Sequence, residues 1–200
     1  MTSTDSWGRL DNRQRSIAAH SNDVLDNRKM TVLPFGNGRS YGDSCHHDAG
    51  MLISSRSMNR IIDTDWEAGT IRVQSGVLLF DILDHLKESH WILSVLPGTK
   101  FVTVGGAIAN DIHGKNHHQQ GTFGCHVKSF QLHRSDVGVV RCSLTENNDL
   151  YKATIGGLGL TGMIVEAEIS LMRVASHFVK EKRTQFGSLL EFETLSEANT

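Results

Sequence analysis

The chain has 200 residues, of which 38% are hydrophobic and 21% charged, as in an ordinary soluble globular chain. Its formal net charge of -2 at pH 7 gives no electrostatic case for nucleic acid, which usually requires a basic surface. No apolar stretch is long enough to cross a bilayer, and the polar amino terminus lacks the pattern of a secretory signal. We therefore expect a cytoplasmic protein without a transmembrane segment or a nucleic-acid partner.

The numbers and positions of the cysteines and glycines say more about the class of protein. Cys45, Cys125 and Cys142 have no zinc-like spacing, and an odd, sparse set without a signal peptide predicts free thiols. Nineteen glycines stand against two prolines, and the glycines are bunched. This bunching indicates close approach of the backbone to another surface rather than a flexible linker.

Hydrophobic periodicity predicts a mixture of strands and helices after thirty weakly patterned residues. Ile71, Val73 and Ser75 share one face of a strand, and apolar residues at helical spacing between Leu78 and Leu86 predict an amphipathic helix. In chain order, we expect strands over residues 30–34, 50–54 and 71–75, a helix over 77–89, hairpin strands over 127–133 and 137–144, a helix over 148–154, strands over 163–171 and 177–183, and a helix over 188–197.

The first glycine cluster follows the strand at 30–34 and reads Phe-Gly-Asn-Gly-Arg-Ser-Tyr-Gly-Asp over residues 35–43. Repeated glycines after a strand can turn several backbone N–H groups toward one concavity, which suits a diphosphate. Arg39 would add a charge and Ser40 a hydroxyl donor. The spacing matches neither a Rossmann turn nor a Walker loop. A tight loop in which glycine only relieves steric strain explains this segment equally well.

Two further clusters favour a large ligand. Residues 103–109 are small, with approachable amides predicted at 103–106, and residues 156–162 contain another run of glycines. One such loop is a turn, whereas three indicate a ligand laid along the backbone. A dinucleotide fits this description, because main-chain groups can bind its diphosphate and ribose hydroxyls.

Histidine is abundant, and one cluster contains His113 and His117 at the spacing of two metal ligands on a helical face. Gly114 and Asn116 disfavour a helix, however, and no acidic residue completes a zinc motif. We therefore expect no metal site, and a zinc-dependent hydrolase is the alternative outside flavin chemistry. The Cys-His-His group at residues 45–47 is interpreted as an exposed polar loop.

The strings GNGRSYGD, LPGT, TVGGAIA, DIHGKNHH, TFG-x-HV and GLTG, in this order, resemble the decaprenylphosphoryl-ribose oxidase family. That family lies within the flavoprotein superfamily of vanillyl-alcohol oxidase and p-cresol methylhydroxylase (PCMH). The resemblance covers roughly residues 33–173. It implies an α+β fold, a two-lobed PCMH-type FAD-binding domain over residues 1–173 with the cofactor between the lobes. Residues 174–200 would begin a truncated substrate domain.

The same resemblance assigns the site residues. Residues 36–43 would form the diphosphate loop, 103–106 would line the diphosphate and ribitol, and 110–113 would run beside the isoalloxazine ring. The implied cofactor-binding residues are Pro34, Phe35, Gly36, Asn37, Gly38, Arg39, Ser40, Tyr41, Gly42, Asp43, Ser44, Gly98, Thr103, Val104, Gly105, Gly106, Asn110, Asp111, Ile112, His113 and Ile164. His113 and Lys115 would be catalytic, and FAD would be bound non-covalently. A histidine that only orders its loop is the alternative for His113.

By this resemblance, the activity would be oxidation of a sugar hydroxyl, on a polyprenyl-phosphate-linked pentose or similar substrate, by hydride transfer to FAD. The partners would be a lipid-linked sugar and a reductase, in bacterial cell-wall or polysaccharide biosynthesis at the periphery of the inner membrane. A stand-alone flavin-binding module without turnover is the alternative.

Three features depart from the family pattern. Asn110 occupies a position that is often cysteine, and Leu158 replaces a polar residue in the third glycine cluster. The segment before Met30 is short, which predicts a trimmed first lobe.

Overall fold

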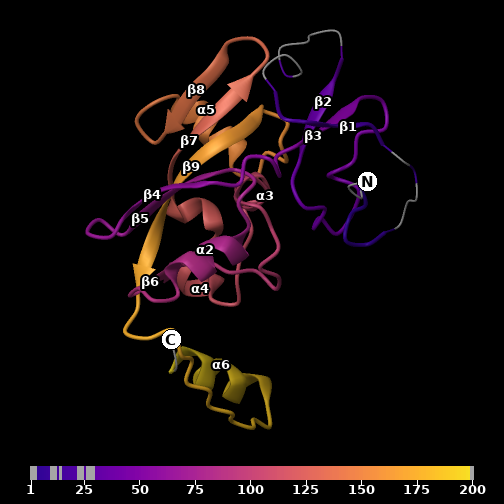
Figure 1. The fold of residues 1–200 in the computed structure, drawn as a ribbon. Coiled ribbons are helices and arrows are strands. Elements are labelled where there is room, and N and C mark those ends of the chain that lie inside the picture. Colours follow the sequence, from indigo (N-terminus) through magenta and orange to yellow (C-terminus); the bar gives the residue numbers. More distant parts are fainter. Residues whose placement is uncertain (1–3, 10–12, 14, 22–24, 26–29, 199–200) are drawn as a thin grey trace.

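The computed structural model describes residues 4–9, 13, 15–21, 25 and 30–198, which form two sheets of unlike construction (Figure 1). The smaller sheet is parallel, with the spatial order β1 (Ile17–Ala19), β3 (Met51–Ser54) and β2 (Val32–Phe35). Leu33, Phe35 and Leu52 are buried together and give this sheet a small core of its own. The smaller sheet and its loops form the first lobe, drawn in indigo and violet.

The larger sheet is antiparallel and is built around β9. Its strands lie in the order β4 (Ile61–Asp65), β5 (Thr70–Gln74), β9 (Met163–Arg173), β7 (Val127–Arg134) and β8 (Gly138–Ser143), and β6 (Trp91–Leu93) also pairs with β9. Ala167, Ile169 and Leu171 alternate along β9 and are buried, as expected of a strand with one face against a core.

Most of the helices cover this sheet or connect its strands, whereas the last one follows β9 and buries none of its side chains. The helices are α2 (Leu79–Leu86), α3 (Val104–Ala109), α4 (His117–Gln120), a 3₁₀ turn (Phe123–His126), α5 (Asn148–Thr154) and α6 (Leu189–Glu197). Leu79, Ile82 and Leu86 of α2 are buried at helical spacing, in the same core cluster as the inward residues of the sheet. The Asp81 carboxylate accepts the Leu78 N–H at 3.0 Å and caps this helix.

Backbone hydrogen bonds at the end of β5 join the two lobes. The Gly76 N–H donates to the Met58 carbonyl at 2.8 Å, on the chain that arrives from the small sheet. The Ser75 N–H donates to the Val165 carbonyl of β9 at 3.0 Å, and the Ser75 carbonyl accepts the Gly105 N–H of α3 at 2.8 Å. Two consecutive residues therefore fix the first lobe, β9 and α3 to one another.

Most of the predicted elements are confirmed. The helix at 148–154 is α5, the hairpin at 127–144 is β7 and β8, and the strands at 30–34, 50–54 and 163–171 are β2, β3 and β9. Ile71, Val73 and Ser75 are all buried on one face, and all three cysteines are free. No helix among the described residues is both long and apolar enough to span a membrane.

Other predictions are wrong or incomplete. Residues 177–183 form no strand; this segment is exposed and pairs with none of the described strands. The trimmed first lobe is contradicted in part, since β1 lies before Met30; residues 22–24 and 26–29 are outside the described residues. The sequence patterns also did not indicate β4, β6 or the helical state of α3.

The chain leaves the larger sheet after β9. Residues 175–194 are all exposed, and α6 buries none of its side chains. Two hydrogen bonds attach the start of this segment to the body, from the Val174 N–H to the His90 carbonyl and between His177 Nε2 and the Ser89 carbonyl, each 2.8 Å long. In Figure 1, α6 stands apart from both sheets.

The junction predicts unequal effects for two glycine-to-alanine substitutions. A Cβ atom at Gly76 would collide with the backbone carbonyl of Ser55, whereas one at Gly42 meets nothing within 4 Å. Gly76→Ala should lower the free energy of unfolding by about 2 kcal/mol or more, because backbone must move to relieve the overlap. Gly42→Ala should change it by less than about 1 kcal/mol. Urea unfolding followed by circular dichroism measures both, and equal effects would contradict this account of the junction.

Candidate functional site

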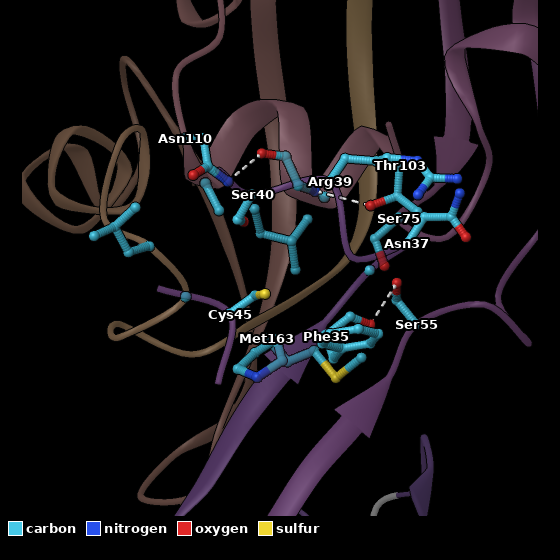
Figure 2. Close-up of a pocket in the computed structure, with 18 of the residues that line it drawn as sticks. Phe35, Asn37, Arg39, Ser40, Cys45, Ser55, Ser75, Thr103, Asn110 and Met163 are labelled. Atoms are coloured by element: carbon cyan, nitrogen blue, oxygen red, sulfur yellow. Dashed lines mark hydrogen bonds between the residues drawn. The ribbon is translucent and has the colours of Figure 1, made fainter. Parts of the chain in front are cut away.

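A cavity opens where the two lobes meet, and all three glycine clusters line it (Figure 2). It encloses about 790 Å³ of space between the protein atoms, part of it open to solvent. The predicted residues that line it are Pro34, Phe35, Gly36, Asn37, Gly38, Arg39, Ser40, Ser44, Thr103, Gly105, Gly106, Asn110 and Ile164. Segments that are far apart in the sequence are thus brought together, as a single extended ligand would require.

Several lining residues were missed by the sequence patterns. They are Cys45, Ser55, Ser75, Ala109, Thr154, Leu158, Gly159, Gly162 and Met163. Ser55 and Ser75 come from the lobe junction, which only the fold places beside the glycine loops. The bunched glycines of the third cluster were visible in the sequence and indicated a ligand near this segment. No residue from 154 to 163 was nevertheless predicted to bind the cofactor.

Other predicted residues do not line the cavity. Tyr41, Gly42 and Asp43 occupy the exposed outer part of the first loop, and Gly98 lies in an exposed turn. The Val104 side chain is buried in the main core.

The segment after α3 has structural contacts of its own. Asp111 has a φ of 42°, and its Oδ1 accepts the Gly124 N–H at 2.8 Å. Ile112 packs against the main core, and its carbonyl accepts the Phe123 N–H at 2.8 Å. These contacts fix the turn that carries the chain from α3 to His113.

The first loop contains unused backbone donors, and five of its residues, Asn37, Gly38, Arg39, Ser40 and Ser44, line the cavity. Among the described residues, no backbone N–H of residues 37–44 donates a hydrogen bond. Gly36 is needed because a side chain there would collide with the Thr103 hydroxyl, and Gly38 because its φ is 60° and a Cβ would meet the Asp5 carbonyl. The glycines of this loop therefore relieve steric overlap, and the loop also keeps backbone N–H groups that a ligand could bind. The two explanations do not exclude each other.

The second cluster differs from its prediction, because its amides are already in use. The Val104 N–H donates to the Val77 carbonyl at 2.9 Å, and the Gly106 N–H donates to the Thr103 hydroxyl at 3.1 Å. The Gly105 N–H is bound to Ser75 as described above. This segment therefore offers the cavity a wall without side chains at Gly105 and Gly106 rather than a set of hydrogen-bond donors.

The third cluster links α3 to β2. The Gly156 N–H donates to the Ile108 carbonyl at 3.0 Å, and the Leu158 N–H donates to the Ala109 carbonyl at 2.8 Å. A Cβ atom at Gly159 would lie 3.3 Å from Pro34 Cδ, so the cluster also packs closely on the first lobe. Leu158 has a φ of 54° and lines the cavity, and its backbone contact with α3 does not depend on a polar side chain.

Arg39 lies over the Trp7 ring, with the guanidinium carbon 5.6 Å from the ring centroid. The Trp7 N–H donates to the Ser40 carbonyl at 2.9 Å, so the amino-terminal arm packs onto the first loop. In the described part of the chain, Arg39 forms no ion pair with an acidic neighbour. Its charge is therefore available at the rim of the cavity.

Residues 45–47 are half-buried, so the prediction of an exposed loop is wrong for them. Cys45 lines the cavity, and burial raises the pKa of its thiol, which keeps it protonated at neutral pH. A neutral thiol would not repel an anionic ligand. His47 Nε2 lies 2.8 Å from the Thr31 hydroxyl and anchors the loop to the start of β2.

The two residues predicted to be catalytic lie outside the cavity. His113 and Lys115 are exposed, on the segment between α3 and α4. The Nδ1 atoms of His113 and His117 both face the Gly114 carbonyl, at 3.4 and 3.2 Å, and the two rings are 5.4 Å apart. His113 precedes α4, so the two histidines do not share a helical face. In the part of the chain that the structure describes, no group of three or more His, Cys, Asp or Glu side chains could hold a metal ion.

Comparisons with known proteins identify the family of this chain. The FAD binding domain family matches residues 21–143. Decaprenylphosphoryl-beta-D-ribose oxidase of Mycolicibacterium smegmatis is 40% identical over 178 residues, which cover 82% of this chain and 38% of that protein. L-gulonolactone oxidase of Mus musculus is 32% identical over 139 residues, which cover 70% of this chain and 31% of that protein. Delta(24)-sterol reductase of Homo sapiens is 32% identical over 120 residues, which cover 60% of this chain and 23% of that protein.

The chain therefore spans less than two fifths of the length of these relatives. The family match covers more than half of this chain and includes the first two glycine clusters. The chain belongs to the FAD-binding domain family of PCMH-type flavoproteins, and its cofactor is FAD.

Proposed function

We propose that the cavity between the lobes holds FAD non-covalently, with the diphosphate against residues 37–44. The observation that carries this proposal is the row of backbone N–H groups in that loop that have no acceptor among the described residues. An anionic diphosphate accepts hydrogen bonds from such groups without requiring any particular side chain. The Arg39 guanidinium would add positive charge at the rim.

The rest of the lining suits an extended dinucleotide. Gly36, Gly105 and Gly106 leave parts of the wall without side chains, so a ligand can approach the backbone closely. Met163 and Ile164 give one part of the cavity an apolar surface, which fits the adenine half of FAD. Asn110, at the end of α3, uses its amide nitrogen to bind the Gly106 carbonyl at 2.9 Å and leaves its side-chain oxygen for the ligand.

The isoalloxazine ring would lie at the outer end of the site, beside residues 110–113. The Nδ1 atom of His113 faces the Gly114 carbonyl, which leaves Nε2 to meet the ring. Because Nδ1 holds the proton that points to this carbonyl, Nε2 would be a donor only in the doubly protonated imidazolium, whose positive charge would stabilise the negative charge that the ring takes up on reduction. Lys115 is exposed on the same segment and would contribute a positive charge to substrate or flavin.

We further infer that this domain belongs to an FAD-dependent oxidoreductase acting on CH–OH groups. Bound FAD supplies the acceptor for the hydride. The relatives named for ribose and gulonolactone oxidation support a sugar hydroxyl as the group oxidised, with a polyprenyl-phosphate-linked pentose as the proposed substrate. A partner reductase would act on the carbonyl product, and a lipid-linked substrate would hold the protein at a membrane surface.

A flavin-binding module without turnover is the second candidate. It is favoured by the exposure of His113 and Lys115, because nothing in the described chain excludes water from the segment that would border the flavin ring. Measuring flavin reduction by a polyprenyl-phosphate-linked pentose separates the two, since only the oxidoreductase turns over.

FAD binding can be tested by absorbance and by its release. Purified protein mixed with FAD should retain flavin absorbance after gel filtration, since the loop amides gain an acceptor and the cavity gains a ligand. Heat or acid should then release all of the yellow colour into the supernatant, because no covalent bond holds it. Failure to bind FAD well above micromolar concentration would refute the site, and colour retained in the denatured pellet would refute the non-covalent attachment.

His113→Ala should raise the Kd for FAD or slow flavin reduction by about two- to tenfold, the worth of one hydrogen bond to the ring. His118→Ala is the matched control, because His118 is exposed on the neighbouring helix α4 and has no assigned contact with FAD. Fluorescence titration gives the Kd, and stopped-flow absorbance with a chemical reductant gives the rate. If both quantities are unchanged in His113→Ala, the histidine only orders its loop.

A further inference from the structure

Ser75 is a buried residue whose hydroxyl has no hydrogen-bond partner. Its exposed fraction is 1%, and among the described residues no atom lies in hydrogen-bonding position to Ser75 Oγ. A buried hydroxyl without a partner costs free energy, and native proteins rarely keep one unless water or a ligand satisfies it. The side chain lines the cavity, and Figure 2 shows it in the same part of the site as Thr103, Asn37 and Ser55.

The backbone hydrogen bonds of Ser75 explain where this residue lies, but they do not explain why its side chain is a serine. Its N–H is bonded to Val165 and its carbonyl to Gly105, so any residue with a backbone N–H could join β9 to α3 here. The Cβ of Ser75 lies 3.0 Å from the place where a Cβ on Gly105 would be. The glycine therefore leaves room for a side chain at 75 directly beside α3, and the hydroxyl on that side chain makes no hydrogen bond with the described residues.

We propose that Ser75 Oγ donates a hydrogen bond to an oxygen of the FAD diphosphate. This inference rests on the proposed function, because it assigns a contact within the FAD site. The hydroxyl belongs to a buried residue that lines the cavity, and residues 37–40 and 44 of the loop with unused N–H groups line the same cavity. A phosphate oxygen would be the acceptor that both lack, and the hydroxyl would reach it from the second lobe.

Ser55 provides a matched control in the same cavity. It is also a serine, is also buried and also lines the cavity, but its hydroxyl already donates to the Phe35 carbonyl at 3.3 Å. Removing that hydroxyl removes a contact within the protein, whereas removing the Ser75 hydroxyl removes none. The two alanine variants should therefore change stability and FAD affinity in different ways.

The experiment measures the Kd for FAD by fluorescence quenching and the melting temperature without FAD, in wild type, Ser75→Ala and Ser55→Ala. Ser75→Ala should weaken FAD binding by about tenfold or more, the worth of a hydrogen bond to a charged group, while its apo melting temperature stays equal or rises. Ser55→Ala should lower the apo melting temperature and change the Kd less. A Kd for Ser75→Ala equal to that of wild type would overturn the proposal.

The affinity for ADP and the apo melting temperature test the assignment to the diphosphate further. ADP competing with FAD should lose affinity in Ser75→Ala by a similar factor, because it contains the diphosphate; an unchanged ADP affinity would overturn the assignment to the diphosphate. A lower apo melting temperature in Ser75→Ala would also count against the proposal, since it would mean that the hydroxyl supports the fold. If wild-type protein does not bind FAD, the proposed function fails instead, so the two failures are distinguishable.

Discussion

The hydrogen bonds at the end of β5 are the constraint on which the site depends. Through Ser75 and Gly76, the backbone holds the incoming chain from the first lobe, the central strand β9 and the short helix α3 at one point. A buried cluster that includes Ile53, Met58 and Met163 adds apolar contact across the same junction. These three parts all contribute to the walls of the cavity, together with the third glycine cluster, so the junction sets much of its shape.

The cavity has two kinds of wall, which differ in whether their backbone N–H groups are already hydrogen-bonded within the protein. The amides of α3 are bonded within the chain, which makes that wall rigid and smooth, whereas the amides of residues 37–44 have no partner in the described chain. A rigid wall facing a loop with unused donors is suited to an anionic ligand that supplies acceptors to the loop and packs on the wall. FAD has both an anionic diphosphate and flat ring systems, and the family to which the chain belongs binds it.

Much of this could be predicted from the sequence, for reasons that differ between segments. Strong periodicity identified β9 and α2, and the order of the glycine strings indicated the family and its cofactor. Helix α3 was missed because its glycines have low helix propensity, and its stability comes from the Thr103 cap and from packing of Ala107 and Ile108. The strand predicted at 177–183 failed because alternation alone cannot supply a pairing partner.

Site residues that act through their backbone could be predicted from the sequence. Residues that only tertiary contacts bring to the cavity were harder to predict. Gly36 and Gly38 line the cavity, as expected if these glycines let the backbone approach a ligand closely. Ser55 and Ser75 were missed, since nothing in their local sequence marks them and only the lobe junction brings them to the cavity. Likewise, the use of the α3 amides depends on Val77 and Ser75, which lie on another segment.

Amide hydrogen exchange with and without FAD tests the central claim most directly, because it reads each N–H group separately. Without FAD, residues 37–44 should exchange fast, and with FAD several of them should become protected as the diphosphate accepts their hydrogen bonds. Residues 104–106 should be protected in both states, since their N–H groups are bonded within the chain. Unchanged exchange at 37–44 when FAD is bound, or new protection confined to other segments, would contradict the account.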